Sequence, residues 1–183
     1  MTRLAPITAK AQLPAAQQPI FDAIVQSRGR IAGPFGVLLH SPELAGRVAH
    51  LGAYVRFDSA LPPAVRELAI LTTARELDCQ YEWTAHVPLA RQAGVRPEAI
   101  DAIGQRTAPA GLTEEEALVV RFGQQLLRQH RVEEATFRAA LARFGPQGTV
   151  DLTATVGYYG LVACVLNAFE VPLEPGVAPL LPA

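Results

Sequence analysis

Lysine and cysteine are nearly absent from this 183-residue sequence, and neither sign of charge is in excess. There is one lysine beside fifteen arginines, there are two cysteines, and the formal net charge is −1. A near-neutral chain has no general basic field to hold nucleic acid or an anionic membrane surface. Two cysteines cannot form a disulfide framework or a four-cysteine zinc site. We therefore expect neither nucleic acid nor a membrane among its partners.

Long uninterrupted apolar runs are also missing. No stretch of about 18 residues, the length that a membrane-spanning helix needs, is free of charged or polar breaks. Residues 1–19 contain two cations but no continuous apolar segment of the kind found in secretory signals. We therefore expect a cytoplasmic protein in a reducing compartment, where free thiols persist. Because half of the residues are apolar and only 18% are charged, the chain can build a sizeable core.

Apolar residues recur at helical spacing along the chain, and no region shows the alternation of several strands. Ser41 before Pro42 is typical of a helix start, and Thr113 to Glu116 has the form of a capping box. The pattern predicts one all-α domain, 1–183, of about seven or eight helices, with extended termini at 1–14 and 172–183. The expected helices cover 15–29, 41–54, 63–77, 79–93, 97–103, 113–130, 133–144 and 146–169.

One helix carries three side chains of chemical interest on a single face. At about 100° per residue, Cys79, Glu82 and His86 lie within roughly 60° of one another. Glu82 and His86 are four residues apart and can hydrogen-bond directly. Cys79 is at the helix start, where the helix dipole is expected to lower its pKa and favour the thiolate. Glu67, on the preceding helix, can orient His86 or relay a proton to it, so these four residues are the predicted catalytic group.

Other residues are candidates for the surroundings of this group. Tyr81 and Trp83 can wall off a small pocket, Tyr158 can reach it from a long apolar helix, and His40 can contact its rim. Cys164 lies in that same apolar helix and is expected to be buried and inert. The four predicted catalytic side chains also include enough donors for zinc or iron, an alternative of lower rank.

The central region resembles the carboxymuconolactone decarboxylase family, which includes alkylhydroperoxidase D. The resemblance lies in Arg66-Glu67-Leu68, in the segment from Cys79 to His86, and in Val87-Pro88-Leu89-Ala90 after it. It implies an all-helical fold that assembles as a homotrimer or hexamer, with a pocket where the helix of the Cys and His meets the helix of the Glu. It implies no required metal or cofactor.

The sequence departs from alkylhydroperoxidase D at one position. That protein has Cys-x-x-Cys-x-x-x-His with a Glu twelve residues before the first Cys. Glu67, Cys79 and His86 match the proton-relay Glu, one redox Cys and the His, whereas Glu82 stands where the second Cys would be. The dithiol route to a hydroperoxide needs a second thiol to resolve the oxidised one. The decarboxylase branch is similar in the Arg-Glu-Leu motif and the later His but lacks this Cys.

Three functions stay open for a small-molecule substrate. The first is a one-Cys, peroxiredoxin-like reduction of hydroperoxides, in which Cys79 is the thiolate and an external thiol is the reductant. The second is a cofactor-free decarboxylation, isomerisation or lactone reaction in which Glu82 and His86 are the acid–base pair. The third is a non-catalytic helical oligomer that binds a ligand. The spacing of Glu67, Cys79 and His86 places the peroxidase narrowly first.

Overall fold

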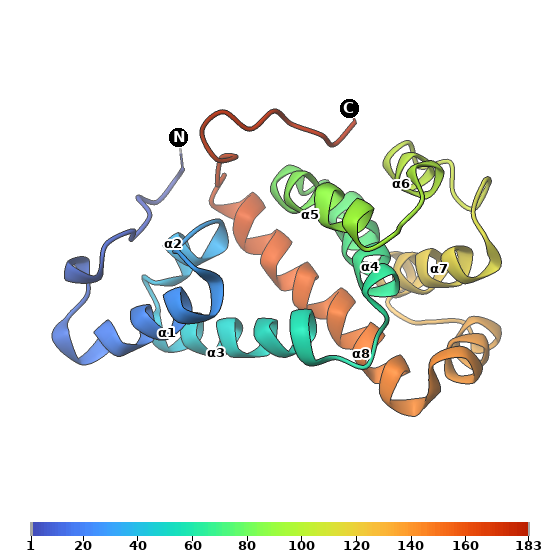
Figure 1. Ribbon diagram of the computed structural model, residues 1–183, viewed down its shortest axis with the longest axis horizontal. Helices are drawn as coiled ribbons and strands as arrows, with labels where there is room; N and C mark the ends of the chain where they lie inside the picture. The colour runs from blue at the N-terminus through green and yellow to red at the C-terminus, as the bar shows by residue number, and fades with distance from the viewer. Residues whose placement is uncertain (1, 183) are drawn as a thin grey trace.

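The structure, a computed structural model, describes residues 2–182, so residues 1 and 183 at the ends of the predicted domain lie outside the described residues. The regular elements in 2–182 are all helical, which confirms the predicted all-α class (Figure 1). The elements are η1 (Lys10–Gln12), η2 (Ala15–Gln17), α1 (Gln18–Arg28), α2 (Pro34–Leu38), α3 (Pro42–Ala53), η3 (Tyr54–Asp58), α4 (Pro63–Glu76), α5 (Gln80–Gln92), α6 (Pro97–Gly104), α7 (Glu114–Gln129) and α8 (Glu134–Ala168).

Local sequence signals account for most helix starts. A proline stands at the first helical position of α2, α3, α4 and α6, where its missing N–H costs nothing. Thr113 caps α7 as predicted, since its side chain accepts a hydrogen bond from the amide of Glu116 and Glu116 bonds back. Ser41 is the N-cap residue of α3, but its side chain makes no capping hydrogen bond.

Helix α8 crosses the whole molecule and separates two groups of helices. In Figure 1, α1, α2 and α3 lie on one side of it and α4 to α7 on the other. Gly145, with φ 69° and ψ 178°, kinks α8 next to Pro146, as the predicted division into 133–144 and 146–169 requires. Each group of helices builds its own apolar cluster against a different part of α8.

Within residues 2–182, α8 is the one helix long and apolar enough to cross a membrane by length and composition alone. The most apolar window of α8 is 61% buried inside the fold. Most of this window therefore packs inside the fold, as in a core helix.

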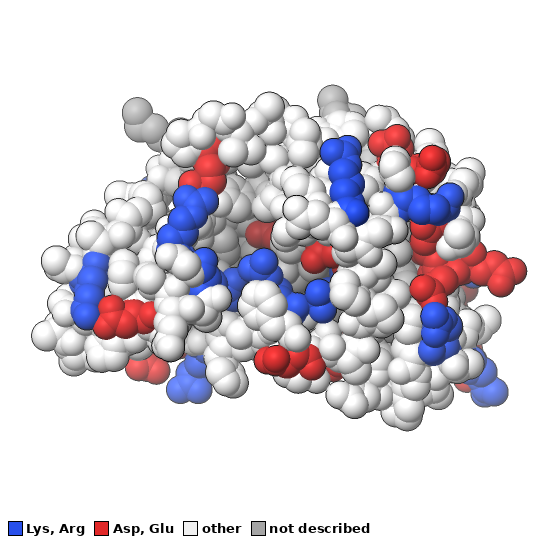
Figure 2. Space-filling view, viewed as in Figure 1, with Lys and Arg blue, Asp and Glu red and all other residues white. Residues whose placement is uncertain are grey.

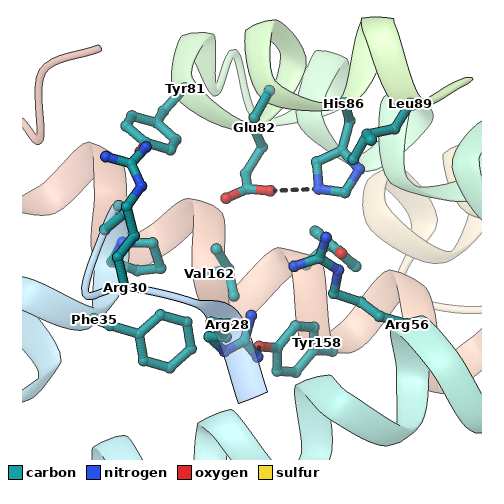
Figure 3. A pocket seen from close by; sticks show the side chains of 15 residues that line it. Arg28, Arg30, Phe35, Arg56, Tyr81, Glu82, His86, Leu89, Tyr158 and Val162 are labelled. Carbon is teal, nitrogen blue, oxygen red and sulfur yellow. Dashed lines mark hydrogen bonds and ion pairs between the residues drawn. The ribbon is translucent and has the colours of Figure 1, made fainter. Parts of the chain in front are cut away.

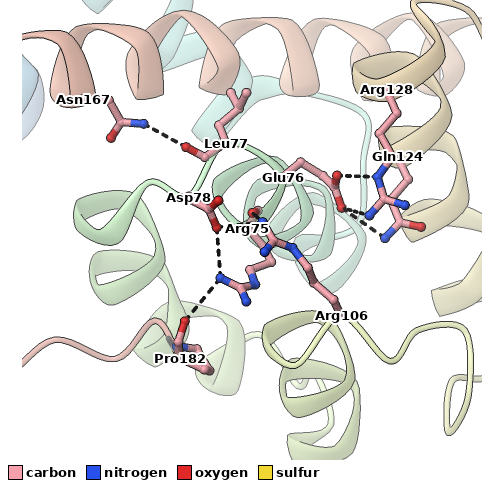
Figure 4. Close-up of polar contacts among 9 residues, drawn as sticks. All are labelled: Arg75, Glu76, Leu77, Asp78, Arg106, Gln124, Arg128, Asn167 and Pro182. Carbon is pink, nitrogen blue, oxygen red and sulfur yellow. Dashed lines mark hydrogen bonds and ion pairs between the residues drawn. The ribbon is translucent and has the colours of Figure 1, made fainter.

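A set of polar contacts fixes the turn between α4 and α5, on which the candidate site depends (Figure 4). Arg75 donates to the carboxylate of Asp78 at 3.0 Å and to the carbonyl of Pro182 at 3.2 Å. From α8, the amide of Asn167 donates to the carbonyl of Leu77 at 2.8 Å. These contacts satisfy backbone carbonyls at the end of α4 and hold the turn against both α8 and the C-terminal segment.

Residues 172–182 form no helix and pass along α5 (Figure 1). The indole of Trp83 donates to the carbonyl of Leu180 at 3.0 Å, and the amide of Leu180 donates to the hydroxyl of Thr84 at 3.1 Å. The segment therefore covers the side of α5 that faces away from α8.

Candidate functional site

The centre of the site is an imidazole held between two carboxylates. Nδ1 of His86 lies 2.7 Å from Oε2 of Glu67, and Nε2 of His86 lies 3.2 Å from Oε2 of Glu82. Glu82 and His86 are one turn apart on α5, and Glu67 comes from α4, which packs against α5. All three side chains are buried. The structure thus brings together three of the four side chains of the predicted catalytic group.

This arrangement makes His86 a cation at neutral pH. Burial alone lowers the pKa of an imidazole, because it penalises the charged form. Here the hydrogen bonds and negative charges of Glu67 and Glu82 more than offset burial and raise the pKa of His86 to about 9. A cation with both ring nitrogens protonated donates to Glu67 through Nδ1 and forms an ion pair with Glu82 through Nε2. The site therefore stores a proton within reach of a cavity.

A cavity of about 190 Å³ opens beside this triad (Figure 3). Glu82 and His86 line it, whereas Glu67 lies behind His86 and does not. Part of the remaining wall is apolar or aromatic and includes Tyr158 and Tyr159 of α8. The ring of Tyr159 meets the ring of His86 edge to face, with 5.0 Å between centroids. Where these side chains take the place of water, the electrostatic interactions of the triad are strengthened.

Three arginines also line the cavity. Arg28 ends α1, Arg30 follows in the next loop, and Arg56 lies on η3, a π-helical turn that continues α3. Figure 2 shows basic side chains around a hollow near the middle of this face, with acidic atoms in its depth. Arg30 is paired with Glu174 of the C-terminal segment at 3.0 Å. The guanidinium of Arg28 lies 4.2 Å over the ring centre of Phe35.

The environment of Cys79 differs from the expected one. Cys79 is the N-cap residue of α5, but its side chain is fully buried in an apolar cluster and is not among the residues that line the cavity. Burial raises the pKa of the thiol to about 11, although the backbone amides of Glu82 and Tyr81 act in the opposite direction. The expectation of a lowered pKa is therefore wrong in this structure, because desolvation outweighs the helix terminus.

The other predicted residues divide between the cavity and elsewhere. Tyr81 and Tyr158 line the cavity. Trp83 does not, because its indole packs in the core beneath Leu180. His40 is exposed and its Nε2 lies 2.8 Å from the carbonyl oxygen of Ala5, so it is not a rim residue either. Cys164 was expected to be buried, but it is exposed, because this position of α8 faces away from the core.

Several cavity residues carried no recognisable sequence signal. The three arginines come from α1, a loop and η3. Because the chain has fifteen arginines, nothing in the sequence singles these three out. Phe35 lies on α2, a short helix that was not predicted from the sequence.

The geometry gives no support to the metal alternative, since Glu67 and Glu82 approach opposite edges of the same imidazole ring.

Residues 42–122 match the carboxymuconolactone decarboxylase family. This stretch includes α3 to α6 and most of α7, and with them Glu67, Glu82 and His86. Arg28 and Tyr158 lie outside it. No protein of curated function matches the sequence.

Several solved structures share the fold at low sequence identity. A peroxidase-related protein from Ralstonia eutropha JMP134, described as an alkylhydroperoxidase AhpD core, is 20% identical with a TM-score of 0.77, and the match covers 98% of each chain. A peroxidase-related protein from Silicibacter sp. TM1040 is 18% identical with a TM-score of 0.73, over 96% of this chain and 93% of the other. The debrominase Bmp8 is 16% identical with a TM-score of 0.72, over 94% and 92%.

Proposed function

We propose that this chain, whose residues 42–122 match the carboxymuconolactone decarboxylase family, is a small-molecule enzyme of the proton-transfer type. In this proposal, His86 and Glu82 are the acid and base for a carbon next to a carbonyl or carboxylate group. The observation that carries the proposal is the buried Glu67–His86–Glu82 triad, whose last two members face the cavity while Cys79 does not.

The two contacts of His86, a hydrogen bond to Glu67 and an ion pair with Glu82, suit different tasks. The bond to Glu67 is short at 2.7 Å and holds the ring in place. The contact with Glu82 is longer at 3.2 Å, so a substrate can take over the Nε2 proton. Glu67 acts through His86 and is a positioning residue, whereas Glu82 and His86 are the proposed catalytic residues.

Both reactions in this class balance with these groups. In a decarboxylation, the bond from carbon to carboxylate breaks, carbon dioxide leaves, and the electron pair stays on the carbon next to the carbonyl group. His86 then gives its Nε2 proton to that carbon and regains a proton from water. In an isomerisation, Glu82 takes a proton from carbon and His86 returns one to a neighbouring carbon.

Hydrogen exchange in heavy water tests this proposal without knowledge of the complete reaction. Small carbonyl and carboxylate compounds are incubated with the protein, and loss of carbon-bound hydrogen is followed by proton NMR. We expect His86→Gln and Glu82→Gln to lower the exchange rate by about a hundredfold or more, and Cys79→Ser to change it less than about threefold. Loss of exchange in Cys79→Ser with full activity in Glu82→Gln contradicts the proposal.

A one-Cys hydroperoxide reductase is the second candidate. It is supported by the backbone amides of Tyr81 and Glu82, which favour the thiolate of Cys79, and by the fold shared with peroxidase-related proteins. The thiolate would attack the hydroperoxide and release an alcohol, with a proton from His86, to leave a sulfenic acid. Two molecules of an external thiol would then restore Cys79 and form a disulfide and water. Peroxide consumption that needs Cys79 and an added thiol would favour this candidate.

We also propose a homotrimer or hexamer in the cytoplasm. The resemblance to the family supports the assembly, and so do Leu44 and Leu51, which are each 46% exposed and two turns apart on α3. Light scattering coupled to gel filtration measures the mass of the assembly. A monomer at micromolar concentration would contradict this part of the proposal.

A further inference from the structure

Two of the cavity's arginines have no acidic partner. Within residues 2–182, no ion pair joins Arg28 or Arg56 to an Asp or Glu side chain, whereas Arg30 is paired with Glu174. Both guanidinium groups are half-buried and line the same cavity. Cations that are partly removed from water without a counter-charge are costly, and a bound anion would offset that cost.

Arg28 is held in one orientation by neutral groups. Its guanidinium lies over the ring of Phe35, and one nitrogen donates to the carbonyl of Ala49 at 3.3 Å and lies 3.5 Å from the hydroxyl of Tyr158. Its Nε atom is buried and has no hydrogen-bond partner. The side chain is therefore fixed in advance while part of its donor capacity stays free, which lowers the entropy cost of binding an anion.

A glycine on α3 makes room for this arrangement. A Cβ atom at Gly52 would collide with the hydroxyl of Tyr158 and with the guanidinium of Arg28. The head groups of both side chains therefore rest on the backbone of α3, at a position where only glycine leaves space for them.

Arg56 faces the cavity from a second direction. It lies on η3, a π-helical turn, and such turns are frequent at functional sites. Figure 3 shows Arg28 and Arg56 across the cavity from Glu82, with His86 on the same side as Glu82. The cavity therefore has one end with an acid–base pair and another with two unpaired cations.

The size and walls of the cavity limit what can fill it. Its volume of about 190 Å³ is slightly larger than the ~150 Å³ that holds a benzene ring in a protein interior. Phe35, Tyr158, Tyr159 and Val162 supply flat or apolar walls. Planar guanidinium groups suit the two oxygens of a carboxylate.

We infer that Arg28 and Arg56 anchor the carboxylate of a small, single-ring organic acid and thereby place its ring against Glu82 and His86. The orientation toward the acid–base pair rests on the proposed function. Binding of the acid itself does not, because the two cations, the aromatic walls and the volume favour it whichever reaction follows.

Calorimetric titration with benzoate tests this inference, with benzamide as a neutral ligand of the same shape and inorganic phosphate as an anion without a ring. We expect benzoate to bind at least tenfold more tightly than either control. Arg28→Gln and Arg56→Gln should each weaken benzoate binding about tenfold. Arg47→Gln is the matched control, because this substitution removes the same charge at a residue that is 81% exposed and does not line the cavity. It should leave the affinity for benzoate unchanged.

Four outcomes overturn the inference: no benzoate binding, equal binding of benzamide, equal binding of phosphate, or full benzoate affinity in Arg56→Gln. Arg28→Lys, which keeps the charge, and thermal unfolding of each variant separate a lost anchor from a lost fold. The titration measures binding alone, so its result does not depend on whether the protein catalyses a reaction. If benzoate binding depends on the arginines but hydrogen exchange is insensitive to Glu82→Gln, the anchor stands and the proposed function fails.

Discussion

His86 and Cys79 are seven residues apart and have opposite electrostatic surroundings. Two carboxylates surround His86 and outweigh its burial, so the charged form is favoured. Apolar side chains surround Cys79, so the neutral form is favoured. Sequence spacing put both residues on one helix face, but Cys79, the N-cap residue, is buried in an apolar cluster and does not line the cavity. Of these two residues, His86 is therefore the one whose surroundings favour the charged form at neutral pH.

The two thiols should differ in reactivity in a way that reverses the sequence expectation. Exposed Cys164 should react with iodoacetamide at a rate typical of a free thiol, whereas Cys79 should react far more slowly at pH 7 and gain reactivity only as the pH approaches about 11. Mass spectrometry of peptides from timed reactions measures both rates, and Cys164→Ser isolates Cys79. Faster labelling of Cys79 than of Cys164 at pH 7 would show that the thiol is activated.

Among the elements, α3 has a demanding role because it carries Gly52 and leads directly into η3, the π-helical turn with Arg56. Close packing of Arg28 and Tyr158 on Gly52 joins α1, α3 and α8 at the cavity. A methyl group added at Gly52 would displace Arg28 and Tyr158, two side chains that line the cavity.

We expect Gly52→Ala to lower the free energy of unfolding by about 1–3 kcal/mol, since overpacking strains a close contact. It should also weaken benzoate binding, because it displaces the Arg28 head group. Gly157→Ala is the matched control: Gly157 is an exposed glycine of α8 with no atom within 4 Å of an added Cβ. It should be neutral or stabilising by about 0.5–1 kcal/mol. Chemical denaturation measures the free energy of unfolding of both variants. Equal stability of the two would contradict the close packing of Arg28 and Tyr158 on Gly52.

Sequence reasoning reached the helices and the triad for identifiable physical reasons. Helical spacing, prolines at helix starts and the Thr113 capping box are local signals, and Glu82 and His86 are neighbours on one helix turn. The contact of Glu67 with His86 was expected from the position of Glu67 on the preceding helix, and the family resemblance points to the same pair. The two arginines of the proposed anchor could not be found from the sequence, because Arg28 and Arg56 line one cavity only after α1, α3 and η3 have packed around α8. The direction of the Cys79 side chain and the exposure of Cys164 depend equally on that packing.

For the whole molecule, the buried cation links stability to pH. The folded-state pKa of His86, about 9, is above the value of about 6.5 for an unfolded chain. The folded protein therefore binds one more proton than the unfolded chain between these values. This contribution to stability is complete below pH 6.5 and is lost as the pH rises through 9.

We expect the free energy of unfolding to fall by about 1 kcal/mol per pH unit between pH 6.5 and 8.5. Cys79, whose pKa is also raised, adds to the loss only above this window. Urea denaturation at several pH values measures this dependence of the free energy of unfolding on pH. The slope should flatten in His86→Gln, and an unchanged slope in that variant would assign it to another group.

The most direct test of the central claim is the protonation state of His86, measured by nitrogen-15 NMR of histidine-labelled protein. The account predicts that one histidine keeps both ring nitrogens protonated through neutral pH and titrates near pH 9. That signal should be absent in His86→Gln and titrate at lower pH in Glu67→Gln. A His86 that is neutral at pH 7 and titrates at or below 6.5 would contradict the buried proton store on which the proposed chemistry depends.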